Sequence, residues 1–173
     1  LNMQTVELAK KYLGDVVLRG GHRRRGKACS RLRISPPVFA KVREYGVPMT
    51  LHAGEAAGPD SMKTALSFGT KRIGHGVAAI NDPELIKRLI DENVTLEVCV
   101  TSNYHTKVVP AIRMHPIHKL LEAGVHVTVN SDNRTCSRTT LQKEKGVLKE
   151  ELGFTDEEIE KMQEYAWEAR FLK

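Results

Sequence analysis

Residues 47–55 read VPMTLHAGE, a short apolar run that ends in polar residues able to carry out chemistry. The segment that follows, PDSMKTALSFG at 59–69, places its apolar residues at helical spacing. A continuous apolar run is typical of a strand in a parallel sheet that helices cover. Together the two segments predict a strand, a loop and a helix, with polar residues where the strand ends.

Three further units repeat this plan along the chain, and their predicted strands begin near residues 72, 95 and 126. The units are KRIGHGVAAI (71–80) with DPELIKRLIDEN (82–93), VTLEVCVTSN (94–103) with HPIHKLLEAG (115–124), and VHVTVNSDN (125–133) with a helical tail. Upstream, TVELAKKYLG (5–14) predicts a helix and DVVL (15–18) the remnant of a preceding strand. Consecutive strand–helix units with right-handed crossovers fit either a doubly wound sheet or half of a (β/α)₈ barrel.

The length of the chain limits the barrel interpretation. A complete (β/α)₈ barrel takes about 250 residues and rarely fewer than about 200, whereas this chain has 173. We therefore expect a single domain over residues 1–173 that forms an incomplete TIM-type (β/α) barrel. Polar residues at several strand ends favour this fold over a doubly wound nucleotide binder, and no G-x-G-x-x-G opens any of the predicted helices.

The net charge of +6 comes from one segment. Residues 19–33, RGGHRRRGKACSRLR, hold seven Lys or Arg and no acid. No aromatic residue is interleaved for base stacking, so a solvated arm is the simplest interpretation, and we do not expect a nucleic-acid partner. An arm that binds the phosphates of a nucleic acid is the alternative that stays open.

Cysteine usage and hydropathy bear on the compartment. Cys29, Cys99 and Cys136 are odd in number and widely spaced, which predicts no disulfide framework and favours a reducing, cytoplasmic location. No run reaches the roughly 18–20 apolar residues of a membrane span, and the first residues do not resemble a signal peptide. We therefore expect no membrane partner.

Four polar side chains fall at or just after predicted strand ends. His52 and Glu55 follow the first strand, His75 ends the second, and Asp132 follows the fourth. In a parallel barrel all these ends open onto one face, so we expect the four side chains to converge on a single pocket. Imidazole and carboxylate together suit Zn²⁺, which activates water, and a nearby glutamate can transfer protons.

The C-terminal segment predicts a helix. Thr155 offers a hydroxyl at the cap and Glu158 a carboxylate three residues later, which is a capping box. We expect the aromatic residues of this segment, Tyr165, Trp167 and Phe171, to contact the core.

Other polar residues are given less specific roles by the sequence. His105, His115 and His118 lie in a predicted loop and at a helix start, and we expect them at the surface. Ser102 and Asn103 are expected to fix the loop after the third predicted strand rather than to touch a substrate.

Four motifs in this order and spacing resemble the adenosine deaminase family of the metal-dependent amidohydrolases. They are LHAGE (51–55), KRIGHG (71–76), EVCVTSN (97–103) and VNSDN (129–133). The resemblance runs from about residue 36 to the C-terminus and implies that the chain holds the last four of the eight barrel units. It also implies hydrolytic deamination of adenosine to inosine and ammonia by a zinc-activated water, as part of purine metabolism.

The resemblance assigns a role to each site residue. His52 and Asp132 would bind Zn²⁺. Glu55 would protonate the purine ring nitrogen beside the carbon under attack. His75 would deprotonate and polarise the zinc-bound water or stabilise the developing oxyanion.

Two further residues would contact the substrate, a small purine nucleoside. They are Gly54 and Asn133, and the second stands where many members of the family carry an aspartate that meets the purine imidazole ring. The amide of Asn133 can either donate or accept that hydrogen bond.

Two departures from the family pattern qualify this interpretation. The family's first strand carries a His-x-His pair of zinc ligands that this sequence lacks, so we expect a weakly bound metal and little or no activity from the 173 residues alone. Residues 19–35 do not follow the family, and disorder or out-of-frame translation would each explain them. A catalytically inactive remnant, or a deaminase of adenine or another aminopurine, are the alternatives. Open barrel edges predict self-association.

Overall fold

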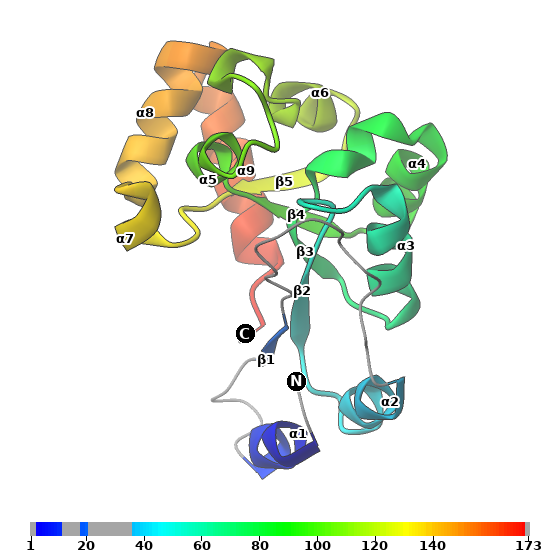
Figure 1. The fold of residues 1–173 in the computed structure, drawn as a ribbon. Coiled ribbons are helices and arrows are strands. Elements are labelled where there is room, and N and C mark those ends of the chain that lie inside the picture. The colour runs from blue at the N-terminus through cyan, green and yellow to red at the C-terminus, as the bar shows by residue number, and fades with distance from the viewer. Residues whose placement is uncertain (1–2, 12–17, 21–35, 172–173) are drawn as a thin grey trace.

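The computed structural model describes residues 3–11, 18–20 and 36–171, and every structural statement below concerns these residues. Its elements alternate between strands and helices for most of the chain (Figure 1). In chain order they are α1 (Met3–Lys11), β1 (Leu18–Gly20), α2 (Pro36–Glu44), β2 (Met49–Ala53), α3 (Pro59–Ser67), β3 (Arg72–His75), the 3₁₀ turn η1 (Val77–Asn81), α4 (Pro83–Asp91), β4 (Thr95–Val98), α5 (Val100–His105), the 3₁₀ turn η2 (Ile112–Met114), α6 (Ile117–Glu122), β5 (His126–Val129), α7 (Arg134–Ser137), α8 (Leu141–Leu152) and α9 (Asp156–Glu168).

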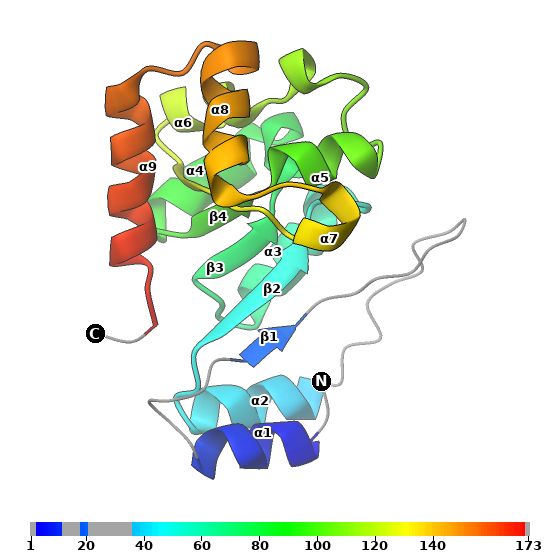
Figure 2. The ribbon, with the colours of Figure 1, turned by 90° about the vertical axis from the view of Figure 1, so that its left-hand side faces the viewer.

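The strands form one parallel sheet in the order β1-β2-β3-β4-β5. Each strand lies beside the one that precedes it in the chain, as in a (β/α) barrel, and the fold is an incomplete TIM-type barrel. Helices α1 and α2 lie side by side beyond β1, while α9 runs along β5 at the other end of the sheet (Figure 2). The four predicted strands are confirmed as β2 to β5.

The preceding strand is β1, which begins where the expected remnant ends. Leu18 pairs with Met49 of β2, and Arg19 and Gly20 continue the ladder. The start of the atypical basic segment 19–35 therefore belongs to the sheet. Residues 21–35, and residues 15–17 of the expected remnant, lie outside the described residues.

The outer face of the sheet is apolar and carries the core. Leu51, Ile73, Leu96 and Val127 stand in register on four adjacent strands and are each no more than 5% exposed. They belong to one apolar cluster with the helices that cover this face. Burial of such a row removes apolar surface from water and is the main force that holds helices on the sheet.

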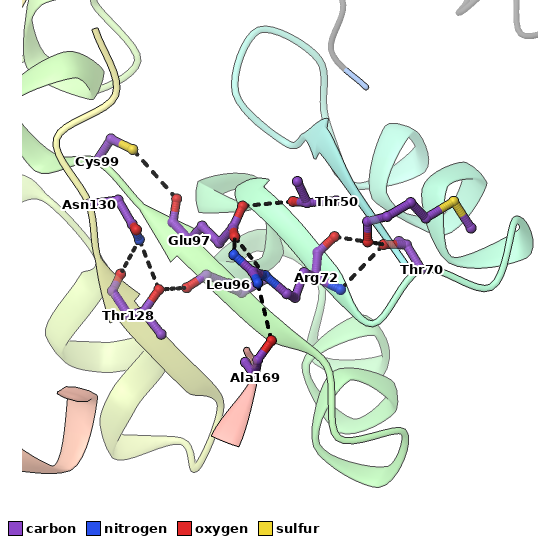
Figure 3. Close-up of polar contacts among 10 residues, drawn as sticks. Thr50, Thr70, Arg72, Leu96, Glu97, Cys99, Thr128, Asn130 and Ala169 are labelled. Atoms are coloured by element: carbon purple, nitrogen blue, oxygen red, sulfur yellow. Dashed lines mark hydrogen bonds and ion pairs between the residues drawn. The ribbon is translucent and has the colours of Figure 1, made fainter. Parts of the chain in front are cut away.

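The inner face of the sheet is polar, so the strands are not the continuous apolar runs that their sequences suggested. Nε of Arg72 donates to Oε1 of Glu97 at 2.7 Å, and Oγ1 of Thr50 donates to Oε2 of the same carboxylate at 2.7 Å (Figure 3). The Arg72 guanidinium also donates to the carbonyl oxygen of Ala169 at 3.1 Å and lies 4.2 Å from the ring centroid of Phe171. Thr50, Arg72, Glu97 and Phe171 line a hollow of about 730 Å³, which His52, His75 and Asp132 also line.

Two local expectations are wrong. Ser102 and Asn103 were expected in a loop, but β4 ends at Val98 and both residues lie in the helix α5, which begins at Val100. Trp167 is 68% exposed rather than in the core, whereas Tyr165 stacks on His126 at 3.9 Å between ring centroids. The face of α9 that carries Tyr165 therefore packs on the sheet, and Trp167 lies outside this contact.

The predicted capping box of α9 is confirmed. Thr155 accepts a hydrogen bond from the Glu158 amide, and the Glu158 carboxylate accepts one from the Thr155 amide. Among the described residues, no helix combines the length and apolar character needed to cross a membrane.

Candidate metal and catalytic site

His52 reaches the hollow from the penultimate position of β2. Its backbone is paired with Gly74 of β3. A Cβ atom at position 74 would lie 3.0 Å from Nδ1 and 3.2 Å from Cγ of the His52 ring, which is tighter than nearly all real Cβ contacts. Glycine at 74 therefore leaves the space that the imidazole occupies.

His75 is the last residue of β3 and is buried, with 1% of its surface exposed. Its φ is 67°, and that of Gly76 is 68°, so the chain turns through two successive left-handed residues. A non-glycine residue in this region stores strain, and such residues concentrate at functional sites. The turn brings the ring of His75 to 5.0 Å from that of His52, in an edge-on arrangement.

Asp132 lies just after β5 and also adopts a left-handed conformation, with φ at 50°. Its Oδ2 accepts a hydrogen bond of 2.8 Å from Oγ of Ser102. One ligand atom from each of His52, His75 and Asp132 lies within 4.8 Å of the other two. The structure thus brings together three of the residues that the sequence placed at the ends of different strands.

Glu55 stands beside this cluster. Its Oε2 is 3.5 Å from Nε2 of His75, and its side chain is 22% exposed, so one carboxylate faces both the cluster and solvent. The neighbouring Gly54 has φ at 69°, and a Cβ there would lie 2.5 Å from Sδ of Met62. The positive φ and the close approach of the Met62 side chain both favour glycine at position 54, where the chain turns toward Glu55.

The two residues expected to contact substrate differ in their surroundings. Gly54 is buried, its N–H donates to Oγ of Ser61 at 2.9 Å, and its carbonyl accepts from the amide of Ala78 at 3.0 Å, so both of its backbone polar groups already have partners in the protein. Asn133 is exposed and caps α7, with Oδ1 accepting from the Cys136 amide at 2.9 Å. Its Nδ2 group can still donate to a ligand.

A buried polar chain leads away from His75. Nδ2 of Asn103 lies 3.1 Å from Nδ1 of His75, and Oδ1 of Asn103 lies 3.2 Å from Nε2 of His115. His115 is 4% exposed, and burial, with a smaller effect of the charge of His75, lowers its pKa to about 4. His115 is therefore neutral at neutral pH.

The surroundings of His75 correct one expectation from the sequence. His115 is buried beside the site rather than at the surface, whereas His105 is exposed and His118 half-buried. Ser102 and Asn103 lie within hydrogen-bond distance of Asp132 and His75, a contact with site residues that the sequence did not indicate. The signal that could have found them is their place directly after a strand, at the same edge of the sheet as His52.

Known protein families show where this chain belongs. The family model for adenosine deaminase matches residues 4–173. The chain belongs to the adenosine deaminase family. An adenine deaminase from Rhizobium meliloti (strain 1021) is 45% identical over 136 residues, which are 78% of this chain and 42% of that protein. An adenosine deaminase from Shewanella loihica is 42% identical over 135 residues, which are 78% of this chain and 41% of that protein.

Solved structures agree on the fold of this adenosine deaminase family member. An amidohydrolase from Burkholderia ambifaria with bound zinc superposes with a TM-score of 0.87, at 20% sequence identity. The match covers 99% of this chain and 48% of the other. The chain thus spans less than half the length of the relatives named here.

Proposed function

We propose that the polar residues at the strand ends form the metal-binding part of a purine deaminase that hydrolyses adenosine to inosine and ammonia. The observation that carries this proposal is the cluster of His52, His75 and Asp132, whose ligand atoms lie within 4.8 Å of one another, beside Glu55. Relatives named adenosine deaminase and adenine deaminase support purine deamination as the class of reaction. They leave adenosine and adenine as the two candidate substrates.

The donor set fits a zinc ion. Imidazole nitrogen and carboxylate oxygen are common ligands of Zn²⁺, and His52 and Asp132 would hold the ion with one donor of each kind. The zinc in the Burkholderia ambifaria amidohydrolase, which shares this fold, supports the choice of metal. When bound, zinc lowers the pKa of water to about 7, so that a nucleophile is available at neutral pH.

The side chains around the cluster suit the remaining steps. Protonated Glu55 would give its proton to the purine ring nitrogen beside the amino-bearing carbon as the oxygen of water bonds to that carbon. The tetrahedral adduct then returns its hydroxyl proton to Glu55 and breaks its bond to the amino group, which takes up the proton that the attacking water gave up and leaves as ammonia. His75 would hold the attacking oxygen or take its proton, and Asn133 and Gly54 would contact the purine.

Two alternatives remain within the same family. A deaminase of adenine or another aminopurine would use the same cluster, because the residues that bind the ribose are not among those assigned here. A catalytically inactive remnant would keep the cluster without turnover. The absence of a His-x-His pair from the sequence favours a low rate for the 173 residues alone, since catalytic zinc usually has three protein ligands.

Zinc content and ammonia release together test the proposal. The unmodified chain, Glu55→Gln and, as a matched control on an exposed part of α9, Glu157→Gln are loaded with zinc and given adenosine, adenine or adenosine monophosphate at high protein concentration. We expect all three proteins to bind zinc, and only Glu55→Gln to lose the slow release of ammonia from adenosine. Release from adenine alone would favour an adenine deaminase. Zinc binding with no ammonia from any purine would favour the inactive remnant.

A further inference from the structure

A buried line of hydrogen bonds connects the first turn of α6 with the candidate catalytic histidine. The amide of Ile117 donates to Nδ1 of His115 at 3.1 Å. The line continues through Asn103, whose Oδ1 lies 3.2 Å from Nε2 of His115 and whose Nδ2 lies 3.1 Å from Nδ1 of His75. The three side chains are at most 4% exposed, so each polar atom along the line depends on its partner in the protein.

The direction of this line is set at its outer end. A backbone amide can only donate, so Nδ1 of His115 must accept, and the proton of the neutral ring is on Nε2. That N–H donates to Oδ1 of Asn103. The amide group of Asn103 then faces His75 with Nδ2, which can only donate, so Nδ1 of His75 accepts and carries no proton.

We propose that Asn103 and His115 are positioning residues that hold His75 in the tautomer with its proton on Nε2. Nε2 of His75 is the atom that lies 3.5 Å from the Glu55 carboxylate. In this tautomer the neutral imidazole presents an N–H toward the reacting groups. His75 therefore acts as a hydrogen-bond donor that stabilises an oxygen as it gains negative charge, and not as the base that takes its proton. This catalytic reading of the tautomer rests on the proposed function.

The opposite tautomer is disfavoured by unpaired buried groups. If Nδ1 of His75 carried the proton, it would meet the donor group of Asn103. Rotation of the Asn103 amide would remove this clash but would then set two donors, its own and that of His115, against each other. Each arrangement leaves a buried donor without an acceptor, which costs about 1–3 kcal/mol. The low pKa of His115 supports the same direction, because its neutral ring keeps an acceptor for Ile117.

If Asn103 had a purely structural role, a change of its side-chain amide would leave the tautomer of His75 unchanged. The backbone of Asn103 already secures its loop, since its N–H donates to the carbonyl of Cys99 and its carbonyl accepts from the amide of Val108. Asn103→Asp keeps these bonds and the size of the side chain. It replaces the donor that faces His75 with an acceptor, which would draw a proton onto Nδ1 of His75.

Long-range proton–nitrogen NMR spectra of the ¹⁵N-labelled, metal-free chain test the proposal, because they separate protonated from unprotonated ring nitrogens. The spectra are taken about two pH units above the ordinary histidine pKa of about 6.5, so that the rings are neutral. We expect the unmodified chain to show an unprotonated Nδ1 and a protonated Nε2 at His75. Asn103→Asp should lose the signal of the unprotonated Nδ1. His118, whose Nε2 lies 2.8 Å from Glu158, is the control that should stay unchanged.

A second pair of variants keeps the test decisive if Asn103→Asp does not fold. His115→Gln retains a donor toward Asn103 and should leave the His75 tautomer as it is, whereas His115→Leu removes the donor and should give a mixture of both tautomers. A protonated Nδ1 at His75 in the unmodified chain would overturn the proposal, as would a tautomer that no substitution changes. The readout does not depend on turnover, so an inactive chain with the expected tautomer would count only against the proposed function.

Discussion

The imidazole of His52 lies across Gly74, its partner on the neighbouring strand, so closely that a single added Cβ would come within 3.0 Å of Nδ1. The strand pairing therefore does more than place His52 at the right end of the sheet. It also sets the ring against the backbone of Gly74, where a ring nitrogen of His52 lies within 4.8 Å of ligand atoms of His75 and Asp132. The space for a candidate metal ligand is thus provided by a residue with no side chain.

Gly74→Ala tests this relationship. The added methyl group should displace the His52 ring and weaken zinc binding by about 10-fold or more, in the range found when groups that orient a metal ligand are lost. Zinc affinity measured by calorimetric titration gives the result, with circular dichroism to check the fold.

Gly146→Ala is the matched control, because a Cβ there meets only Oε1 of Glu150, at 3.9 Å. This helical substitution should leave zinc affinity unchanged and raise the free energy of unfolding by about 0.5–1 kcal/mol. Equal zinc affinity in Gly74→Ala and Gly146→Ala would show that Gly74 does not orient His52.

The pKa of His115 predicts a pH dependence of stability. Burial lowers this pKa to about 4 in the folded chain, whereas an unfolded histidine has a pKa of about 6.5. Between these values the unfolded state binds more protons, so stability falls as the pH drops. The contribution of His115 should fall by about 2 kcal/mol between about pH 7 and about pH 5.

Urea unfolding of the unmodified chain and of His115→Gln at both pH values measures this contribution. The variant should lose less stability on acidification, since it has no imidazole to protonate. An equal loss in both proteins would mean that His115 titrates in the folded chain as it does when unfolded.

The capping box of α9 makes a prediction about stability alone. Thr155→Ala removes the hydroxyl that accepts from the Glu158 amide, and this should cost about 1 kcal/mol of unfolding free energy. The measurement is the midpoint of urea unfolding. Zinc binding should not change, because α9 contributes none of the candidate ligands. A variant as stable as the unmodified chain would show that the capping box does not stabilise the fold.

The sheet edges predict self-association. Within the described residues, β1 and β5 each have a strand on one side only, and the polar inner face is open. Unpaired strand edges invite pairing with another chain. Size-exclusion chromatography with light scattering should therefore give a mass above 19.4 kDa that falls on dilution. A chain that stays monomeric at all concentrations would contradict this prediction.

The fold could be predicted from the sequence to a large extent because two periodic signals agree. Apolar runs mark β2 to β5 and helical spacing marks the segments between them, so the unit repeats along the chain. The convergence of His52, His75 and Asp132 follows from that fold, since parallel strands deliver their carboxyl ends to one edge. The strands, the helices between them and the edge where the polar residues meet could therefore all be predicted from the sequence.

The burial of His115 could not be predicted in this way. A histidine that follows a polar loop has the local signature of a surface residue, and it becomes buried only because α5, η2 and α6 fold together over the strand ends. The prediction that Trp167 contacts the core was wrong for the converse reason. A large aromatic residue on an amphipathic helix suggests the core, but this one is exposed. Both outcomes depend on contacts between elements far apart in the chain.

Anomalous diffraction from crystals of the zinc-loaded chain, recorded on both sides of the zinc absorption edge, would show whether the polar strand ends form one metal site. We expect a zinc peak at about 2.0–2.2 Å from a nitrogen of His52 and an oxygen of Asp132, with Glu55 and His75 beside it. A zinc peak elsewhere on the protein, or coordinates that place these four side chains on different sides of the molecule, would contradict it.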